Sequence, residues 1–293
     1  MIIIKLMGGL GNQMFQYAFG KSLAIKNNIE LKLDTSFLLD RTPHKKHFVF
    51  RDYDLSIFNV DAIFATEKEV KELTQRTSSP FVDRILNQSI GFKKSYIKDM
   101  GLVFNSTHLT IKDNAYLEGY WQSEKYFSEI SLDLKQFFFT YRSLLETKAK
   151  TLINRINGVN AVCVNVRRGD FVINSFHGTM GVDYYMKAEK MLLEKYEGLE
   201  FFVFSDDIDW CKENLHFKSL TTFVGHEYAG HKFQDYLRLM SACKHFIIPN
   251  SSFAWWAVWL STYSNKMIIA PKNWINNPPN SVDDLIPKDW IRI

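Results

Sequence analysis

Four clusters of polar or glycine residues carry the side chains and backbone amides most suited to binding a ligand. They occupy residues 8–13, 167–170, 205–207 and 249–252, and each directly follows an apolar run. Ligands of parallel α/β sheets bind outside the carboxyl ends of the strands. Because all four clusters stand where a predicted strand ends, they predict a ligand site at these strand ends.

The most informative cluster is Arg167-Arg168-Gly169-Asp170. Two guanidinium groups at the end of a strand suit a diphosphate, which they bind through paired charge-assisted hydrogen bonds. Neighbouring strand residues point to opposite faces, so we predict that one arginine faces the ligand and the other a buried carboxylate such as Asp170. The alternative is an arginine–aspartate pair that serves only the structure.

The glycine cluster near the N-terminus half-matches a dinucleotide-binding fingerprint. Gly9 and Gly11 supply two glycines of the GxGxxG pattern, but Met14 stands at the third, where it would crowd the approach of helix and strand. We therefore expect no nicotinamide cofactor. Either the glycines form a tight turn that needs a positive φ, or their amides and the Asn12 side chain reach a substrate.

The third cluster has two aspartates, and with the nearby Asp209 they allow two interpretations. Asp207 and Asp209 form an Asp-x-Asp pair that could clamp a divalent metal on a nucleotide sugar. Asp206 or Asp207 could instead cap a helix that starts at Ile208, since aspartate is a preferred N-cap residue. We favour the capping interpretation and predict no metal site.

The fourth cluster ends a strand and opens a helix. Asn250, Ser251 and Ser252 offer amides and hydroxyls at a helix N-terminus, where anions bind; simple N-capping by either serine is compatible with that role. Trp255, Trp256 and Trp259 follow at i, i+1 and i+4. That spacing predicts a buried helix face rather than a sugar platform.

Two further places offer candidates for catalysis and sugar binding. His177, in a predicted loop, is a proton acceptor near neutral pH, although a lone loop histidine is often ordinary. Residues 119–122 (GYWQ) close a predicted strand. Their rings could stack on an acceptor sugar, or they could form the edge of an aromatic core.

The elements that must position these clusters alternate as strands and helices. Residues 2–6, a glycine turn, a helix over 13–26 capped by Asn12, and 30–34 form a β–α–β opening, which implies a parallel sheet. We predict further strands at 115–121, 161–166, 199–204, 220–224, 245–249 and 267–270. Predicted helices cover 66–77, 80–90, most of 123–157, 183–197, 208–215, 232–242 and 252–263. The chain thus reads as two α/β domains, residues 1–158 and 159–293, facing a cleft.

Composition excludes several classes of protein. The chain has 293 residues, 46% of them hydrophobic and 23% charged, which excludes an intrinsically disordered or collagen-like chain. Three dispersed cysteines form no CxxC pair, so we expect neither a zinc knuckle nor a disulfide framework. The net charge of +4 is too small to indicate a nucleic-acid-binding protein. No signal peptide or membrane span is evident, which predicts a cytoplasmic protein and leaves peripheral association with the inner membrane surface open.

Taken together, the motifs resemble those of the family 11 glycosyltransferases, the α-1,2-fucosyltransferases, over nearly the whole chain. Residues 8–16 (GGLGNQMFQ) are similar to the N-terminal signature of this family, and 119–127 (GYWQSEKYF) to a second motif. Residues 167–170 match the HxRRxD motif shared with α-1,6- and protein O-fucosyltransferases. Residues 204–207 and 250–256 match later motifs. In the HxRRxD motif, Asn165 replaces the leading histidine, so an amide must make whatever contact the imidazole makes.

The resemblance implies a GT-B-like fold with two Rossmann-like parallel-sheet domains. It also implies an inverting, metal-independent transfer of L-fucose from GDP-β-L-fucose to the 2-hydroxyl of a terminal galactoside, in glycan or O-antigen synthesis. No cofactor is expected beyond this donor substrate. The alternatives are a metal-dependent transferase for another nucleotide sugar and a non-catalytic carbohydrate-binding protein.

The resemblance also implies roles for individual residues: Arg167 would hold the β-phosphate, Asp235 would bind guanine, and Ser251 and Ser252 would add phosphate contacts. Together with the residue-based reasoning above, this predicts Arg167 and His177 as catalytic residues. The predicted nucleotide-sugar site consists of Gly9, Gly11, Asn12, Asn165, Arg167, Arg168, Asp170, Asp206, Asp235, Asn250, Ser251 and Ser252. The predicted acceptor site consists of Gln13, Tyr120, Trp121 and Gln122. His177, Asp183 and Asp34 are the candidates for a general base, and the sequence does not choose among them.

Overall fold

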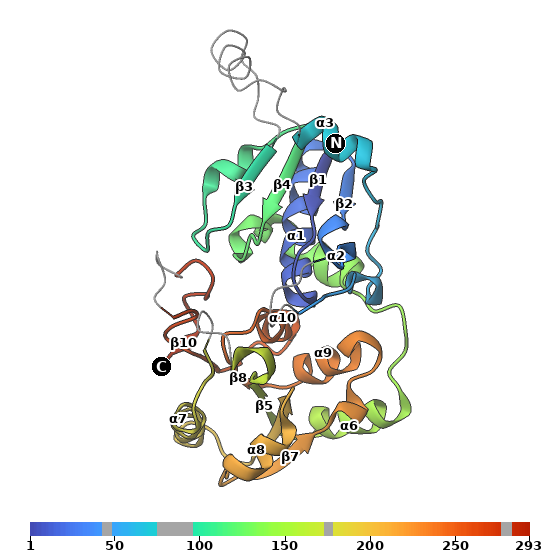
Figure 1. Ribbon diagram of the computed structural model, residues 1–293. Coiled ribbons are helices and arrows are strands. Elements are labelled where there is room, and N and C mark those ends of the chain that lie inside the picture. Colours follow the sequence, from blue (N-terminus) through green and yellow to red (C-terminus); the bar gives the residue numbers. More distant parts are fainter. Residues whose placement is uncertain (43–48, 75–95, 173–177, 277–282) are drawn as a thin grey trace. The chain divides into compact units, whose positions relative to one another are not determined.

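The computed structural model of the chain describes residues 1–42, 49–74, 96–172, 178–276 and 283–293. They form two compact units, the first comprising Met1–Leu55 with Val60–Phe138 and the second Ser56–Asn59 with Phe139–Ile293 (Figure 1). This division comes earlier than the boundary at 158 expected from the sequence. The reason is that helix α6 (Thr147–Gly158) packs on strand β5 (Asn160–Val166) and helix α9 (Gln234–Ser241) of the second unit.

The first unit contains a four-stranded parallel sheet in the order β2-β1-β4-β3. Its strands are β1 (Ile2–Lys5), β2 (Leu31–Asp34), β3 (Tyr96–Asp99) and β4 (Ala115–Gly119). Three of them confirm predicted strands. Strand β3 was not predicted because it has only four residues, none of them fully buried, and so lacks a continuous apolar run.

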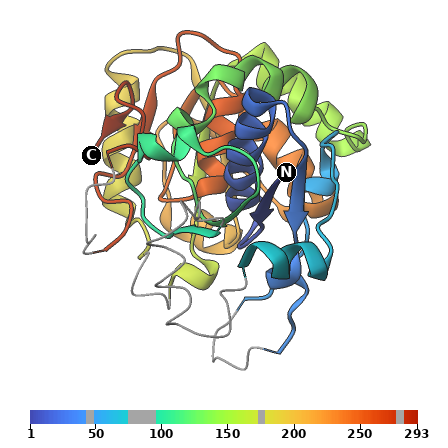
Figure 2. The same cartoon turned by 90° about the horizontal axis from the view of Figure 1, so that it is seen from above.

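Helix α1 (Leu10–Asn27) packs along β1 and β2 of this sheet (Figure 2). Its N-cap is Gly9, and no side chain caps it, so the predicted cap Asn12 lies inside the first turn. Gly20 allows the helix to approach the strands closely: a Cβ at this position would lie 2.8 Å from Leu31 Cδ1.

The remaining helical segments of the first unit are short. They are α2 (Ser36–Leu39), α3 (Glu67–Thr74), α5 (Ser131–Asp133), a π-helical turn at Leu134–Phe138, and 3-10 turns at Ser106–Thr110, Glu124–Tyr126 and Ser128–Ile130. Residues 123–157 are mostly helical, as predicted, but they are divided into short 3-10, α and π turns and the regular helix α6. The helix expected at 80–90 lies outside the described residues.

One face of the first sheet carries a row of alternating charges at its carboxyl end. The strand register places Asp34, Lys5, Glu118 and Lys98 side by side on β2, β1, β4 and β3. Glu118 accepts hydrogen bonds from Lys5 (3.2 Å) and Lys98 (2.6 Å), and from the Tyr96 hydroxyl (2.8 Å). Burial alone raises the pKa of Glu118, but the three donors outweigh it and lower that pKa. The row thus stabilises an ionised carboxylate that is largely shielded from water.

The second unit contains a six-stranded parallel sheet in the order β10-β9-β8-β5-β6-β7. Besides β5, its strands are β6 (Leu199–Ser205), β7 (Leu220–Val224), β8 (His245–Ile247), β9 (Ile268–Ala270) and β10 (Ile291–Arg292). The alternation of strands and helices predicted for this part is confirmed. Only the two-residue β10 was missed. The two parallel α/β units confirm the Rossmann-like domains expected of a GT-B-like fold.

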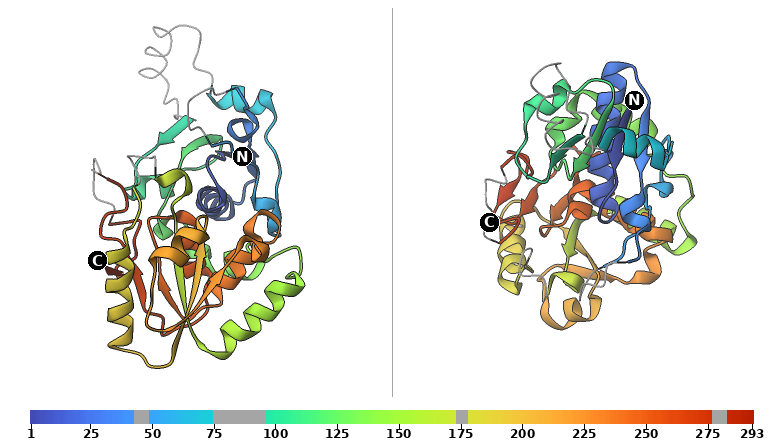
Figure 3. Two further views of the ribbon diagram at one scale, coloured as in Figure 1. Left: turned by 60° about the horizontal axis from the view of Figure 1, so that its bottom comes forward. Right: turned by 45° about the horizontal axis from the view of Figure 1, so that its top comes forward.

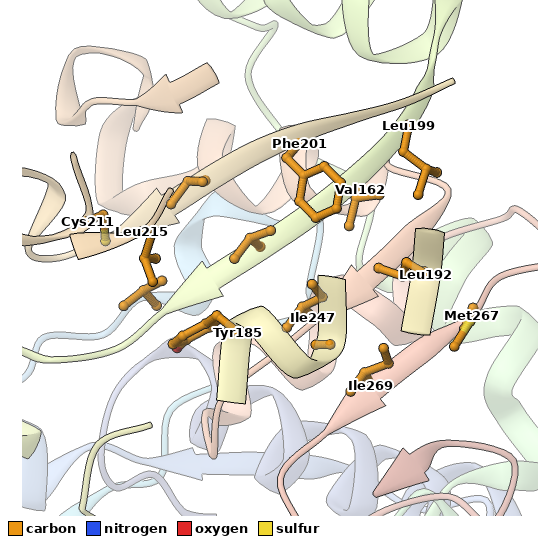
Figure 4. Packing of buried hydrophobic residues seen from close by; sticks show 14 residues of the cluster. Val162, Tyr185, Leu192, Leu199, Phe201, Cys211, Leu215, Ile247, Met267 and Ile269 are labelled. Carbon is orange, nitrogen blue, oxygen red and sulfur yellow. The ribbon is translucent and has the colours of Figure 1, made fainter. Parts of the chain in front are cut away.

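Helices cover both faces of the second sheet. Besides α6 and α9 they are α7 (Val182–Leu193), α8 (Ile208–Asn214) and α10 (Ser252–Leu260), with α6 and α7 on opposite sides of the sheet (Figure 3). Val162, Phe201 and Ile247 of the strands meet Tyr185 and Leu192 of α7 in a continuous apolar core (Figure 4). Within the described ranges, no helix combines the length and apolar character needed to cross a lipid bilayer.

Aromatic residues make up 15% of the sequence, and the largest fully buried side chains of the two units are aromatic. Trp255 and Trp256 of α10 are fully buried, and Trp259 is half-buried. The Trp255 indole donates a hydrogen bond to the carbonyl of Leu285 (2.9 Å), and the rings of Trp256 and Phe139 pack edge to face. The predicted packing role of the α10 tryptophans is therefore confirmed.

At the amino end of β8, His245 is a fully buried histidine held neutral by its surroundings. Its Nδ1 accepts a hydrogen bond from the Met267 amide (3.1 Å), so Nε2 carries the proton. The ring packs on that of Tyr196 at 4.1 Å between centroids. Burial and the nearby positive charges of Lys195 and Lys244 lower the pKa of His245 to about 4.

Replacing Glu118 by glutamine should destabilise the first unit. Glu118→Gln leaves Lys5 and Lys98 without their shared carboxylate, so we expect the free energy of unfolding to fall by about 1–3 kcal/mol in urea titrations. The control is Glu72→Gln, which removes an exposed ion pair to Lys68 on α3 and should change that value by less than about 0.5 kcal/mol. Equal effects of the two substitutions would contradict the special role of the row.

His245 should make the protein sensitive to mild acid. An unfolded histidine titrates near pH 6.5, whereas His245 in the folded protein titrates at about 4. Keeping His245 neutral therefore contributes fully to the free energy of unfolding above pH 6.5. As the pH falls from 6.5 to 4, this contribution of ~3 kcal/mol is lost. His245→Asn should flatten this part of a plot of unfolding free energy against pH, whereas His216→Asn, at an exposed position, should not. An unchanged slope in His245→Asn would refute the assignment.

Candidate functional site

Three of the four predicted clusters follow strands that are neighbours in the second sheet. Strands β8, β5 and β6 are adjacent, and residues 249–252, 167–170 and 205–207 come directly after them. Since all strands are parallel, these clusters share the carboxyl edge of one sheet. The fourth cluster, residues 8–13, follows β1 in the first unit.

The Asp206 carboxylate joins the ends of β5 and β6. One of its oxygens forms an ion pair with Arg167 Nη1 at 2.9 Å, and the other accepts a hydrogen bond from the Arg168 amide at 2.8 Å. Gly169 makes this approach possible, because a Cβ there would lie only 2.5 Å from Asp206 Oδ2. The Arg167 side chain keeps 27% of its surface exposed, with its guanidinium over the Phe171 ring. A cation is thus held in a defined position but within reach of solvent.

The second arginine of the motif is bound to α8. Arg168 Nε lies 3.1 Å from Asp207 Oδ2, and its guanidinium lies 3.9 Å from the centre of the Trp210 ring. The sequence-based expectation named Asp170 as the partner of one arginine. In the structure Asp206 and Asp207 are the carboxylates on the two arginines; Asp170 is in a 3-10 turn at Gly169–Phe171, and its side chain is outside the described set.

Asp207 caps helix α8, as the favoured interpretation predicted. Its Oδ1 accepts a hydrogen bond from the Trp210 amide, while Asp209 pairs with Lys212 on the helix surface. Across the described residues, no three histidine, cysteine or carboxylate side chains gather in an arrangement that could hold a metal ion. The geometry therefore assigns Asp207 to the cap and to Arg168.

The residue that replaces the motif histidine lies at the edge of the sheet. Asn165 is 8% exposed, and its Nδ2 donates a hydrogen bond to the Phe204 carbonyl at 3.1 Å. The Tyr185 hydroxyl donates to the Asn165 carbonyl from the opposite side at 3.3 Å. This hydrogen bond links β5 to β6 two residues before Arg167 in the chain.

The cluster after β8 is the start of helix α10. The Ser251 hydroxyl accepts a hydrogen bond from the Ala254 amide, which confirms the predicted N-cap. Asn250 Nδ2 donates to the Trp274 carbonyl at 3.0 Å and so fixes the approach to the helix. Ser252, the first residue of the helix, is half-buried. The amides of this first turn supply partial positive charge at the same sheet edge as Arg167.

Asp235, implied to bind guanine, is enclosed within the second unit. It is 0% exposed, accepts a hydrogen bond from the Glu146 amide (3.1 Å) and lies 3.4 Å from Arg238. It also lies against Gly230, where a Cβ would come within 2.7 Å of the Asp235 Cγ. The carboxylate therefore braces the loop before α9. It does not face solvent, although the implied contact with a nucleobase would require an accessible carboxylate.

Amide side chains hold the glycine cluster of the first unit in place. Gly9 starts α1 and Gly11 is buried in its first turn. Gln13 donates to the carbonyls of Gly8 and Asp52 and accepts from the Asp54 amide, so its polar atoms are already used. Asn12 accepts a hydrogen bond from Gln122 (2.7 Å), which brings these two predicted site residues together.

Gln16 is a residue that the sequence reasoning did not single out. It is fully buried, accepts a hydrogen bond from the Met7 amide and donates to the Gly119 carbonyl. It therefore ties the ends of β1 and β4 together. Its place at the end of the motif GGLGNQMFQ, one turn after Asn12 and Gln13, was the signal that could have revealed it.

Trp121 lies in the core of the first unit and not at its surface. Its side chain is packed against the Phe19 ring at 4.7 Å and the His108 ring at 5.1 Å, and the residue is 2% exposed. The predicted sugar contact is thus blocked by packing. Tyr120 beside it is half-buried, and Gln122 keeps part of its surface exposed, so these two retain access.

The three candidate general bases have different surroundings. Asp34 is 4% exposed, and its oxygens accept hydrogen bonds from the Tyr116 hydroxyl and the Ser36 amide. Asp183 is exposed in the first turn of α7. His177 lies outside the described residues.

Comparison with known proteins gives a consistent picture over the whole chain. The model of the Glycosyl transferase family 11 matches residues 1–293. An α-1,2-colitosyltransferase of Escherichia coli is 33% identical, covering 100% of this chain and 98% of its own. The O-antigen biosynthesis glycosyltransferase WbnK of Escherichia coli is 29% identical over 98% of this chain and 99% of its own. Galactoside α-(1,2)-fucosyltransferase 2 of Rattus norvegicus is 30% identical over a stretch that covers 42% of this chain and 37% of its own.

These matches agree with the motifs and with the strand-end site. The family model spans both α/β units, and the arginine motif lies where a parallel sheet binds ligands. A non-catalytic carbohydrate-binding protein is therefore set aside. The chain belongs to glycosyltransferase family 11.

Proposed function

We propose that this enzyme transfers L-fucose from GDP-β-L-fucose to the 2-hydroxyl of a terminal galactoside, with inversion to an α-1,2 linkage, in the synthesis of O-antigen or a related glycan. The observation that carries the proposal is the Arg167–Asp206 pair at the carboxyl edge of the second sheet. The names of the relatives, which include galactoside α-(1,2)-fucosyltransferase and O-antigen glycosyltransferase, support the acceptor and the linkage.

The proposed mechanism uses this site to stabilise the leaving group. As the bond between the sugar and the phosphate lengthens, the sugar gains oxocarbenium character and negative charge develops on GDP. Arg167 and the first turn of α10 offset that charge, and Asp206 keeps the guanidinium preorganised for it. The acceptor hydroxyl attacks from the opposite face. Asp183 is the exposed candidate for removing its proton, and His177 is the other.

A second donor is favoured by one comparison. The relative with 33% identity over the whole chain is named for the transfer of colitose, which is fucose without its 3-hydroxyl. A site that hydrogen-bonds the 3-hydroxyl would reject colitose strongly, whereas a site that merely tolerates it would discriminate weakly. The two candidate functions thus differ in a single polar contact.

A donor screen distinguishes these functions. The enzyme is incubated with a galactose-terminated acceptor in a buffer containing EDTA, together with GDP-fucose, GDP-colitose, GDP-mannose or a UDP-sugar, and the product linkage is determined by NMR. We expect an α-1,2-fucoside, undiminished by EDTA because Arg167 and α10 supply the positive charge. Preferential transfer of colitose would establish the second function. Transfer of another sugar, or transfer only with added divalent metal, would refute both.

Arg167→Ala should lower turnover strongly with the accepted donor. Removing one preorganised electrostatic stabiliser costs about 10²–10³ in kcat. The matched control is Arg155→Ala, which removes a surface ion pair with Glu200 and should leave turnover within about twofold. The measurement is kcat of both variants from steady-state kinetics. Near-normal turnover of Arg167→Ala would exclude a role of Arg167 on the diphosphate.

A further inference from the structure

Contacts connect an exposed aromatic residue of the second unit to the residue before Asp206. Phe233, in the segment between β7 and α9, is 47% exposed. Its ring meets the His226 ring edge to face, at 5.8 Å between centroids. His226 Nε2 lies 3.1 Å from the carbonyl of Ser205, the residue before Asp206. A chain of direct contacts therefore connects Phe233 to the carboxylate that holds Arg167.

The backbone at Phe233 has an unfavourable conformation. Lys232 (φ 51°, ψ 35°) and Phe233 (φ 60°, ψ 21°) are both left-handed, two residues after the left-handed Gly230. Left-handed conformations are rare for bulky residues without glycine's freedom, and two in succession persist only where the surroundings impose them. Such strain concentrates at sites that bind ligands.

Several buried contacts impose this conformation. The Asp235 carboxylate fits against Gly230, and the backbone amide of Asp235 donates a hydrogen bond to the Ala229 carbonyl. The Tyr236 hydroxyl donates to the Val224 carbonyl at 2.6 Å, which anchors α9 to the end of β7. Lys232 reaches Ser56 at 3.1 Å. These contacts brace the backbone around the ring, while nearly half of the ring itself remains in water.

The Phe233 ring packs edge to face on Tyr236 as well as on His226, but this packing leaves 47% of the residue exposed. A half-exposed ring recovers only part of the free energy that burial would supply, yet the loop is strained to present it. The ligand that suits an aromatic face beside a diphosphate-binding arginine is the flat base of a nucleoside diphosphate, because bases stack on aromatic side chains. The contacts through His226 and Ser205 place the ring and the arginine on one sheet edge.

We propose that Phe233 is the stacking platform for the nucleobase of the donor, and that Asp235 is a positioning residue that holds the platform's loop. This inference rests on the proposed function, since it concerns the nucleotide of the same donor. It accounts for the enclosure of Asp235, which acts on the base through the loop and not by direct contact.

The test measures binding of GDP and of inorganic pyrophosphate, which lacks the base, by titration calorimetry. Phe233→Asn removes the ring but keeps a residue that tolerates the left-handed conformation, so the loop should remain folded. We expect its Kd for GDP to rise about 5- to 100-fold, with the Kd for pyrophosphate unchanged within about twofold. Phe233→Tyr keeps the ring and should bind GDP like the parent protein.

The control for the loss of an exposed apolar side chain is Leu220→Asn. Leu220 is 62% exposed at the amino end of β7, away from the proposed site, so we expect parental GDP affinity. In thermal unfolding, the midpoint of each of the three variants should lie within about 4 °C of the parent's midpoint. A lower midpoint in Phe233→Asn together with equal losses for GDP and pyrophosphate would show a structural role and overturn the proposal.

The remaining outcomes separate this inference from the proposed function. If the parent binds GDP and Phe233→Asn binds it equally well, the platform is refuted and the proposed donor class stands. If the parent prefers another nucleoside diphosphate such as UDP, and that binding depends on Phe233, the platform stands and the proposed donor is wrong. A parent that binds no nucleoside diphosphate would refute both.

Discussion

The sheet edge that we propose as the donor site depends on one carboxylate, that of Asp206. It is at the end of β6, yet it accepts the side chain of Arg167 and the backbone amide of Arg168 from the end of β5. It adds a side-chain link to those that Asn165 and the Arg168–Asp207 pair make between the ends of β5 and β6, and it restricts the rotamers of Arg167. A cation that must offset developing charge acts best when it is already in place, because no reorganisation is then needed during the reaction.

The other parts of the site follow the same pattern of a polar group fixed by a second polar group. Arg168 and Asp207 bind β5 to α8, Ser251 caps α10, and Asp235 braces the segment that presents Phe233. In the first unit, Gln13 and Gln16 satisfy backbone groups around the glycine loop. Buried polar groups are costly unless they are hydrogen-bonded, so each such pair also stabilises one local conformation.

The parallel topology could be predicted because it depends on local patterns. Short apolar or alternating runs, most of them followed by a predicted helix, identified five strands of the second sheet and three of the first. The strands that escaped, β3 and β10, are short and lie at sheet edges. Their sequences lack a distinct apolar run because half of their surface needs no burial, and only pairing with a neighbour makes them strands.

The sequence by itself determined the family, the two α/β units, and the positions of Arg167, Asp207 and Ser251 at strand or helix ends, because these follow from motifs and from residues close together in the chain. Only the tertiary structure decided the partners. Whether Arg168 pairs with Asp170 or Asp207 depends on β6 lying beside β5. Whether Trp121 and Asp235 face ligand or core depends on what packs around them. The environment of a side chain is set by neighbours that are distant in the sequence. For this reason only the structure shows that Phe233 is an exposed ring on a strained loop.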